Sequence, residues 1–225
     1  MKDGEKLTNV YFPVFLNLEG KLCVVIGGGK VGERKVLSLL QAKAFVKLIS
    51  PEATPVLQKL AEEGQILWEK RIYQPGDLEG AWLVVAATND PSTQRSIYDE
   101  ANAKRVFCNM VDVPEFCSFI VPSVVKRGSL TIAISTSGAS PAVARRIRES
   151  LEMQFGPEYE IYLKLMENLR KQILELNLSP TEKEIKLHRL AMAPIPQYIR
   201  NRDLDLLKTI IEKEGLIFPS ELFES

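Results

Sequence analysis

The chain has 225 residues, of which 45% are hydrophobic and 26% charged, a composition typical of a globular protein with one domain and a smaller second one. Lys plus Arg and Asp plus Glu are equal, at 29 each, so no overall field attracts nucleic acid or an anionic membrane. We therefore expect neither as a partner, and an acidic substrate must be bound by a local basic cluster.

The start of the chain and the cysteines indicate the compartment. Residues 1–20 are interrupted by charges and by Pro13, and they hold no long apolar run of the signal-peptide kind. The cysteines Cys23, Cys108 and Cys117 form no CxxC pair, and two of them lie in apolar, strand-like runs. We expect a cytoplasmic protein with neither disulfides nor a bound metal.

The first half of the chain has the pattern of βαβ units around a parallel sheet, because short β-branched runs alternate with longer amphipathic stretches. The expected strands are residues 22–26, 45–50, 66–69, 82–87 and 106–109, and the expected helices are residues 30–42, 53–63 and 92–104. Right-handed crossovers place the carboxyl ends of such strands at one edge of the sheet. We expect an α/β domain of the Rossmann type, with its chemistry at that edge.

The pattern changes after residue 112. Two β-rich runs, 118–125 and 130–135, are joined by residues 126–129 and predict a hairpin. Ser140 is a candidate N-cap, with Pro141 at the first helical position. Charged helices follow from about residue 156.

We therefore expect three parts. They are a Rossmann domain over residues 1–113, a β-rich region over 114–150 and a helical carboxyl-terminal domain over 151–225.

A glycine-rich loop follows the first strand and opens the first helix. Gly27, Gly29 and Gly32 fit the pattern GxGxxG, in which the glycines allow a tight turn, close approach to a pyrophosphate and helix–strand packing. The alternative is a tight strand-to-helix turn with no ligand. The agreement of strand, helix and spacing favours a dinucleotide cofactor.

The residues after the second and fourth strands bear on which dinucleotide is bound. The second strand ends near Pro51 and Glu52, and Glu52 lies about twenty residues beyond the glycines, where an acidic residue can bind the ribose. No Arg or Lys follows that strand to accept a 2′-phosphate, so NAD is favoured over NADP. Glu52 is equally suited to the first turn of the next helix. Thr88 and Asn89 are further cofactor candidates, and their alternative role is in a turn.

Two dehydrogenase classes are disfavoured by missing residues. No Tyr has a Lys four places on, as the short-chain dehydrogenases require. His188, the single histidine, lies in a charged helical stretch rather than at the sheet edge, where a hydroxyacid dehydrogenase needs a general base.

Asp112 is the candidate catalytic residue. It lies just beyond the last parallel strand, where a carboxylate faces the cofactor crevice and can exchange a proton while hydride leaves. The alternative is a turn aspartate ahead of Pro114.

The order of motifs resembles the precorrin-2 dehydrogenase and sirohydrochlorin ferrochelatase family. The runs that carry the resemblance are residues 11–15 (YFPVF), 25–35 (VIGGGKVGERK), 86–90 (AATND), 108–112 (CNMVD), 118–123 (SFIVPS) and 135–141 (STSGASP). Together they span roughly residues 11–150, about two thirds of the chain, whereas the glycine loop alone matches many nucleotide-binding families.

The resemblance implies that NAD accepts a hydride from precorrin-2 to give sirohydrochlorin, with Asp112 as the catalytic aspartate. It also implies cofactor contacts at Lys30, Val31, Pro51 and Glu52. It further implies a homodimer in which the strands over 118–135 and the helices that follow them mix between subunits, with the substrate between the NAD domain and that region.

The family substrate carries many carboxylates, and we expect a set of polar and basic residues to contact it. This set is Ser135, Thr136, Arg145, Arg146 and Arg148, with Lys126 and Arg127 as further basic residues. The alternative for the arginines is a solvated helix face balanced by glutamates.

Two other functions stay open. Some relatives also insert iron into sirohydrochlorin, a reaction in which Asp112 would serve as base and transient ligand. A module that senses NAD without chemistry shares the glycine loop but needs no Asp112. A small-substrate dehydrogenase is disfavoured because the sheet edge lacks a suitable His or Lys.

Overall fold

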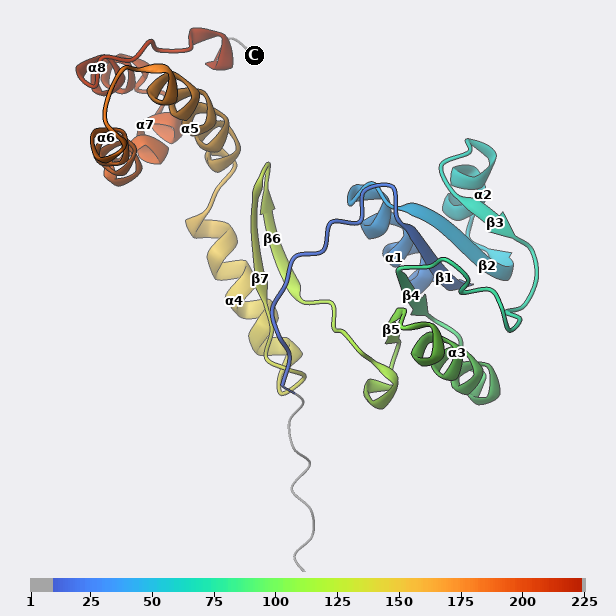
Figure 1. Ribbon diagram of the computed structural model, residues 1–225. Helices are drawn as coiled ribbons and strands as arrows, with labels where there is room; N and C mark the ends of the chain where they lie inside the picture. The colour runs from blue at the N-terminus through green and yellow to red at the C-terminus, as the bar shows by residue number, and fades with distance from the viewer. Residues whose placement is uncertain (1–9, 224–225) are drawn as a thin grey trace, which may run out of the picture. The chain divides into compact units, whose positions relative to one another are not determined.

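The computed structural model describes residues 10–223, which form two compact units, residues 10–121 and residues 122–223 (Figure 1). The sequence predicts no signal peptide in residues 1–20, and the first nine of these residues lie outside the described part of the chain. The three-part division of the chain stays a prediction.

The first unit is a doubly wound α/β domain around a five-stranded parallel sheet with the strand order β3-β2-β1-β4-β5. Its strands are β1 (Leu22–Gly28), β2 (Phe45–Ala53), β3 (Leu67–Glu69), β4 (Leu83–Ala86) and β5 (Phe107–Met110). Its helices are α1 (Lys30–Gln41), α2 (Pro55–Glu62) and α3 (Pro91–Lys104). The predicted Rossmann-type fold is confirmed.

The core of this unit has two layers, one on each face of the sheet. Successive side chains of a strand point to opposite faces. Val25 of β1 therefore packs in one cluster with Val36 of α1 and Leu57 of α2, whereas Val24 packs in the other with Ile97 of α3. Because both faces are covered, the central strands are apolar throughout, as the sequence pattern required.

The carboxyl end of β2 differs from the prediction. The strand continues to Ala53, which pairs with Gly28 of β1, and α2 begins only at Pro55. The residue before a proline is restricted to extended backbone, and Thr54 accordingly has φ −61° and ψ 157° and caps α2. The predicted strand end at residue 50 and helix start at residue 53 were therefore wrong.

The segment after β5 also differs from the prediction. A 3-10 turn, η1 (Pro114–Phe116), follows β5, and the strand expected from residue 118 begins only at residue 123 as β6 (Ser123–Arg127). The Ser118 amide donates to the Cys108 carbonyl at 2.8 Å, and Pro122 has no amide to give to a ladder. Residues 118–122 are thus held out of the second sheet.

The second unit begins with the predicted hairpin. Strand β6 pairs antiparallel with β7 (Leu130–Ile134), and Arg127 pairs with Leu130, so the turn has two residues rather than the expected four. Gly128, the first turn residue, has φ +56°. This conformation suits the primed turns of two-residue hairpins.

Helices make up the rest of the second unit. Ser140 caps α4 (Pro141–Gln154) as predicted, since its hydroxyl accepts from the Val143 amide at 3.3 Å. The following helices are α5 (Glu158–Glu175), α6 (Pro180–Met192), α7 (Ile195–Asn201), α8 (Leu204–Lys213) and the 3-10 helix η2 (Ser220–Phe223). Leu165, Ile195 and Leu207 are among the fully buried side chains of their common core. Over residues 10–223, no helix combines the length and apolar character needed to cross a membrane.

Candidate functional site

The glycine loop brings three elements of the first unit into close contact. Gly27 has φ +106°, and a Cβ there would lie 2.3 Å from the Ala87 carbonyl oxygen that follows β4. A Cβ on Gly32, in the first turn of α1, would lie 2.0 Å from the Gly27 carbonyl oxygen. Both positions therefore require glycine for packing, as the pattern predicts.

Gly29 differs from the other glycines of the loop. It is the N-cap of α1, with φ −77° and ψ −174°, and among the described residues no atom other than those of its chain neighbours lies within 4 Å of the position that its Cβ would take. No side chain caps this helix end, so its amide donors and partial positive charge are open to a ligand. An exposed helix N-terminus with empty space at its glycine fits the pyrophosphate of a dinucleotide.

The sequence pattern missed a link between the glycine loop and β2, which Gly28 and Ser50 form. A Cβ on Gly28 would lie 2.2 Å from the Glu52 carbonyl oxygen, because β2 continues beside it. The Gly28 amide donates to Ser50 Oγ at 2.9 Å, and both residues are buried. The pattern GxGxxG leaves its second position free, so only the partner strand reveals this requirement.

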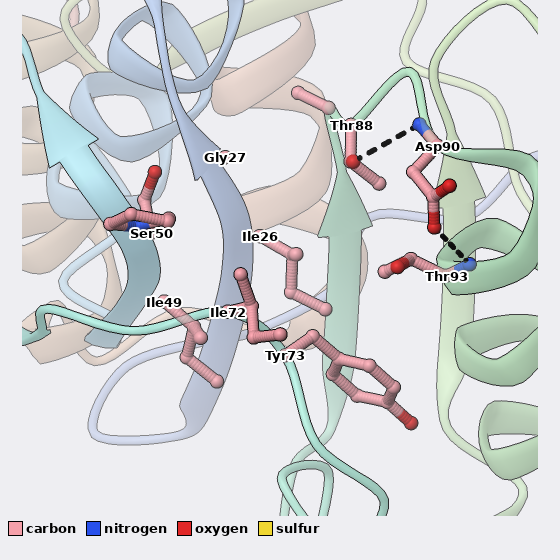
Figure 2. Close-up of a pocket in the computed structure, with 11 residues that line it drawn as sticks. Ile26, Gly27, Ile49, Ser50, Ile72, Tyr73, Thr88, Asp90 and Thr93 are labelled. Carbon is pink, nitrogen blue, oxygen red and sulfur yellow. Dashed lines mark hydrogen bonds between the residues drawn. The ribbon is translucent and has the colours of Figure 1, made fainter.

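A cavity of about 360 Å³ opens beside this loop at the carboxyl ends of β1, β2 and β4 (Figure 2). It is lined by Ile26, Gly27, Ile49, Ser50, Pro51, Ile72, Tyr73, Ala87, Thr88, Asp90 and Thr93. Its volume lies within the range of small-molecule and cofactor sites. The carboxyl edge of a doubly wound sheet is also where such ligands bind.

The predicted cofactor residues divide between the cavity and its surroundings. Gly27, Pro51 and Thr88 line the cavity. The remaining predictions lie next to these residues along the chain and do not line it; they are Gly29, Lys30, Val31, Gly32, Glu52 and Asn89. Their roles as cofactor contacts stay predictions.

Asp90 and Thr93 organise the wall of the cavity that follows β4. The Thr93 amide donates to Asp90 Oδ2 at 2.7 Å, and the Asp90 amide donates to Thr88 Oγ1 at 3.4 Å (Figure 2). The hydrogen bonds from Thr93 and Ser92 lower the pKa of the Asp90 carboxyl, so an anion caps the N-terminus of α3. The sequence carried a signal for this cap, an Asp directly before Pro91.

Tyr73 and Ile72 form another wall, from the long connection between β3 and β4. The Tyr73 hydroxyl donates to the carboxylate of Glu100 on α3, and the amides of Gly76 and Leu78 donate to the same carboxylate. This one half-buried carboxylate thus fixes the connection against α3. The sequence had no signal for these residues, because the segment has no periodic pattern.

A carboxylate in the first turn of α1 ties the glycine loop to α2. Glu33 is 9% exposed, accepts a hydrogen bond from Thr54 Oγ1 and pairs with Lys30 Nζ at 3.2 Å. The Thr54 hydrogen bond, with the Lys30 contact, holds the pKa of this carboxyl below its usual value against the opposing effect of burial. The side chain of Lys30 is otherwise largely exposed.

Asp112 lies in a tight turn directly after β5, the strand that pairs with β4. It is exposed, with φ +62°, a conformation that is uncommon for residues other than glycine and is tolerated best by Asn and Asp. The Val111 amide donates to the Ala86 carbonyl at 2.9 Å, so the turn starts at the carboxyl end of β4. Asp112 is therefore at the same edge of the sheet as the cavity.

The predicted substrate residues belong to the second unit. Thr136 Oγ1 donates to the Ser140 carbonyl and accepts from the Ser140 amide, both at 3.1 Å, while Ser135 Oγ accepts from the Ser137 amide at 3.0 Å. Both hydroxyls thus stabilise the loop that leads into α4. Their contact with substrate stays a prediction.

The three arginines of α4 have different surroundings. Arg145 pairs with Glu149 at 2.9 Å, and Arg148 pairs with Glu152 at 2.5 Å. Arg146 is exposed and makes no ion pair within the described part of the chain. The expected balance by glutamates therefore applies to two of the three.

Two families match consecutive parts of the chain. One is described as "Putative NAD(P)-binding" and matches residues 14–123, and the other is described as "Sirohaem biosynthesis protein central" and matches residues 127–154. The first covers β1 to β5 and the glycine loop, and the second covers the hairpin turn and α4.

Curated siroheme synthases are similar to the same stretch. That of Methylobacillus flagellatus is 43% identical over 147 residues, which are 65% of this chain and 32% of that protein. Siroheme synthase 2 of Yersinia pseudotuberculosis is 38% identical over 173 residues, 77% of this chain and 37% of that protein. The chain thus spans about a third of the length of the curated relatives it matches.

A solved structure resembles the chain over most of its length. It is titled "SirC, precorrin-2 dehydrogenase" and matches with a TM-score of 0.76 at 26% identity, covering 90% of this chain and 100% of that one. The chain thus combines a segment that matches a nicotinamide-dinucleotide-binding family with one that matches the sirohaem-biosynthesis central family, and it shares its fold with a precorrin-2 dehydrogenase.

Proposed function

We propose that this protein is a dehydrogenase that oxidises precorrin-2 to sirohydrochlorin in siroheme biosynthesis, with NAD as the hydride acceptor. The observation that carries the proposal is one sheet edge with two features: an open glycine N-cap suited to a pyrophosphate and an aspartate held at φ +62°. Similarity to siroheme synthases and to a precorrin-2 dehydrogenase supplies the substrate class.

The residues around the end of β2 support NAD over NADP in this proposal. Residues 50–54 (SPEAT) include no cation to neutralise a 2′-phosphate, and the exposed Glu52 carboxylate would repel one. The same carboxylate is suited to accept hydrogen bonds from ribose hydroxyls.

The oxidation removes two hydrogen atoms from the macrocycle, one as hydride and one as a proton. NAD, when bound, accepts the hydride. The Asp112 carboxylate takes the proton as general base and passes it to solvent, to which the turn after β5 is exposed. The amide donors at Gly29 and the packed glycines Gly27 and Gly32 hold the dinucleotide at the edge where this transfer occurs.

The assay is anaerobic, with purified protein, precorrin-2 and NAD, and it follows NADH together with the sirohydrochlorin spectrum. We expect NADH to form in step with sirohydrochlorin. Asp112→Asn keeps the left-handed conformation and the side-chain size but removes the base, so turnover should fall by about 10²- to 10⁴-fold. NAD binding without any oxidation would favour a sensing module instead.

The same reaction mixture tests metal insertion. Fe²⁺ or Co²⁺ is added once the oxidation is complete, and insertion is followed against a sample without protein. Enzyme-accelerated insertion that Asp112→Asn abolishes would extend the activity to a ferrochelatase. A rate equal to the sample without protein would restrict the activity to oxidation.

We also propose that the protein is a cytoplasmic homodimer formed through the hairpin and α4. Apolar side chains there are solvent-exposed: Val124 by 40%, Val143 by 48% and Ile147 by 40%. Exposed apolar side chains of this kind are what a subunit interface covers. Light scattering should give twice the mass of one chain, and Ile147→Glu should shift the protein toward monomer.

A further inference from the structure

One sulfur atom closes the turn that carries Asp112. Cys117 Sγ lies 3.2 Å from the Met110 amide nitrogen, 3.2 Å from the Met110 carbonyl oxygen and 3.5 Å from the Val113 carbonyl oxygen. The thiol accepts the hydrogen bond from Met110 N–H and donates its own hydrogen to one of the two carbonyls. Its contacts lie on both sides of Asp112 in the chain.

The segment that carries this thiol is itself anchored to β5. The Ser118 amide donates to the Cys108 carbonyl, and the Cys108 amide donates to Ser118 Oγ, both at 2.8 Å. The Asn109 side-chain amide donates to the Phe119 carbonyl at 3.1 Å. Because both flanking segments are fixed, a sulfur bridging them restrains the turn between them.

The orientation of the Asp112 carboxylate depends on the backbone of that turn. Within residues 10–223 the Asp112 side chain has no hydrogen bond or ion pair of its own. Its direction is therefore set by the left-handed backbone at φ +62°. The left-handed backbone is uncommon for a residue other than glycine, although Asp tolerates it, so neighbouring contacts help to hold it in place.

The hydrogen bonds of Cys117 to backbone carbonyls require a protonated thiol. Burial raises the pKa of Cys117 above its ordinary value of 9.0, although the Met110 hydrogen bond and the nearby Lys35 of α1 act in the opposite direction. A thiol that stays protonated at neutral pH can donate to a backbone carbonyl. Cys117 can therefore both accept and donate a hydrogen bond in this turn, which an apolar residue of the same size cannot do.

We propose that Cys117 is a positioning residue, whose thiol holds the turn of residues 110–113 so that the Asp112 carboxylate stays at the cofactor edge of the sheet. What the carboxylate does there rests on the proposed function. The restraint itself rests on the sulfur contacts alone.

The experiment compares three variants of the full chain. Cys117→Ala removes the donor and the acceptor, and Cys117→Ser keeps both. Cys108→Ala removes a buried thiol from the apolar cluster that Cys117 packs against, but leaves the sulfur contacts of Cys117 in place. For each, kcat, KM and the NAD dissociation constant are measured, together with hydrogen exchange of the peptide that spans residues 109–116.

We expect Cys117→Ala to lower kcat on the order of tenfold or more, with NAD affinity unchanged and faster exchange in that peptide. Cys117→Ser should restore most of the turnover and the protection. Cys108→Ala should lower only the melting temperature. Unchanged kcat in Cys117→Ala, or a loss that serine does not restore, would overturn the role.

Failure of the proposed function gives a different result. If the wild-type protein binds NAD but does not oxidise precorrin-2, the function is wrong, and hydrogen exchange alone decides the restraint. Faster exchange in Cys117→Ala, reversed by serine, then supports the thiol as the clamp of the turn. Equal hydrogen exchange in wild type, Cys117→Ala and Cys117→Ser rejects the restraint.

Discussion

The amide nitrogen of Gly28 donates a hydrogen bond to the Oγ atom of Ser50 across 2.9 Å, between two buried residues of adjacent strands. This bond joins the glycine loop to the end of β2, where the cavity opens. Ser50→Ala should leave the Gly28 amide without its partner and lower the free energy of unfolding by about 1–3 kcal/mol. Urea denaturation measures the loss, and Ser50→Thr, which keeps the hydroxyl, is the control; equal stability of wild type and Ser50→Ala would contradict the role of the bond.

Alanine should have different effects at the neighbouring positions Gly28 and Gly29, on stability at the first and on NAD binding at the second. Gly28→Ala places a Cβ 2.2 Å from the Glu52 carbonyl oxygen, so we expect a loss of about 1–3 kcal/mol in stability. Gly29→Ala meets no atom of the described residues within 4 Å beyond its chain neighbours, so it should stay within about 1 kcal/mol of wild type. It should nevertheless lose NAD binding, because its methyl group would occupy the space proposed for the pyrophosphate. Melting curves and NAD titrations of the two variants check this. Tight NAD binding by Gly29→Ala would place the dinucleotide elsewhere.

Glu33 should contribute stability that depends on pH. Its pKa in the folded protein is lowered from the ordinary 4.5, chiefly by the Thr54 hydrogen bond. A lowered folded-state pKa means that the contribution is fully present above the ordinary value and is lost as the pH falls through the folded-state value. The stability difference between wild type and Glu33→Gln should therefore be largest near neutral pH and shrink below pH 4.5.

Urea denaturation at pH 7, 5 and 4 measures that difference. Glu62→Gln, on the exposed side of α2, removes a carboxylate without these contacts and serves as the matched control. A Glu33→Gln difference that is constant over this pH range would show that the carboxylate has no special stabilisation in the folded protein.

Glu52 should determine the preference between NAD and NADP. Its exposed carboxylate follows Pro51, which lines the cavity. Glu52→Gln should weaken NAD binding through loss of the charge-assisted ribose contact and strengthen NADP binding, because the repulsion of the 2′-phosphate is removed. Fluorescence titration with both reduced cofactors measures the ratio. If the ratio does not change, the Glu52 side chain contacts neither the ribose nor the 2′-phosphate.

Arg146 should be the arginine of α4 that matters most for substrate affinity. Arg145 and Arg148 are already paired with glutamates of the same helix, whereas Arg146 has no such partner within residues 10–223. Arg146→Ala should raise KM for precorrin-2 with little change in kcat, since it removes a contact to a distant carboxylate. Arg145→Ala is the control and should have a smaller effect. A larger rise in KM for Arg145→Ala than for Arg146→Ala would assign the substrate contact to Arg145 instead.

Much of the first unit was predictable because its signals are local. The alternation of apolar runs with amphipathic stretches indicated five strands and three helices, and all of them formed. Ser140 and Pro141 marked the start of α4 correctly, because capping depends on residues within one turn of a helix. The close packing that the glycine spacing predicted was likewise found at Gly27 and Gly32.

The misplaced boundaries have nonlocal causes. The sequence alone placed the end of β2 at residue 50, but pairing with Gly28 carried the strand to Ala53. The run from residue 118 looked like a strand, yet hydrogen bonds to Cys108 hold its start against β5. In both cases a backbone partner far away in the chain overrode the local preference.

By itself, the amino-acid sequence determined the class of fold, the glycine loop and the aspartate after the last parallel strand, because periodicity and turn chemistry act over a few residues. Only the tertiary structure decided that Ile72 and Tyr73 line the cavity, that Ser50 binds Gly28 and that the Cys117 thiol closes the turn of Asp112. These contacts join residues from separate elements, and no local pattern encodes which separate elements will meet.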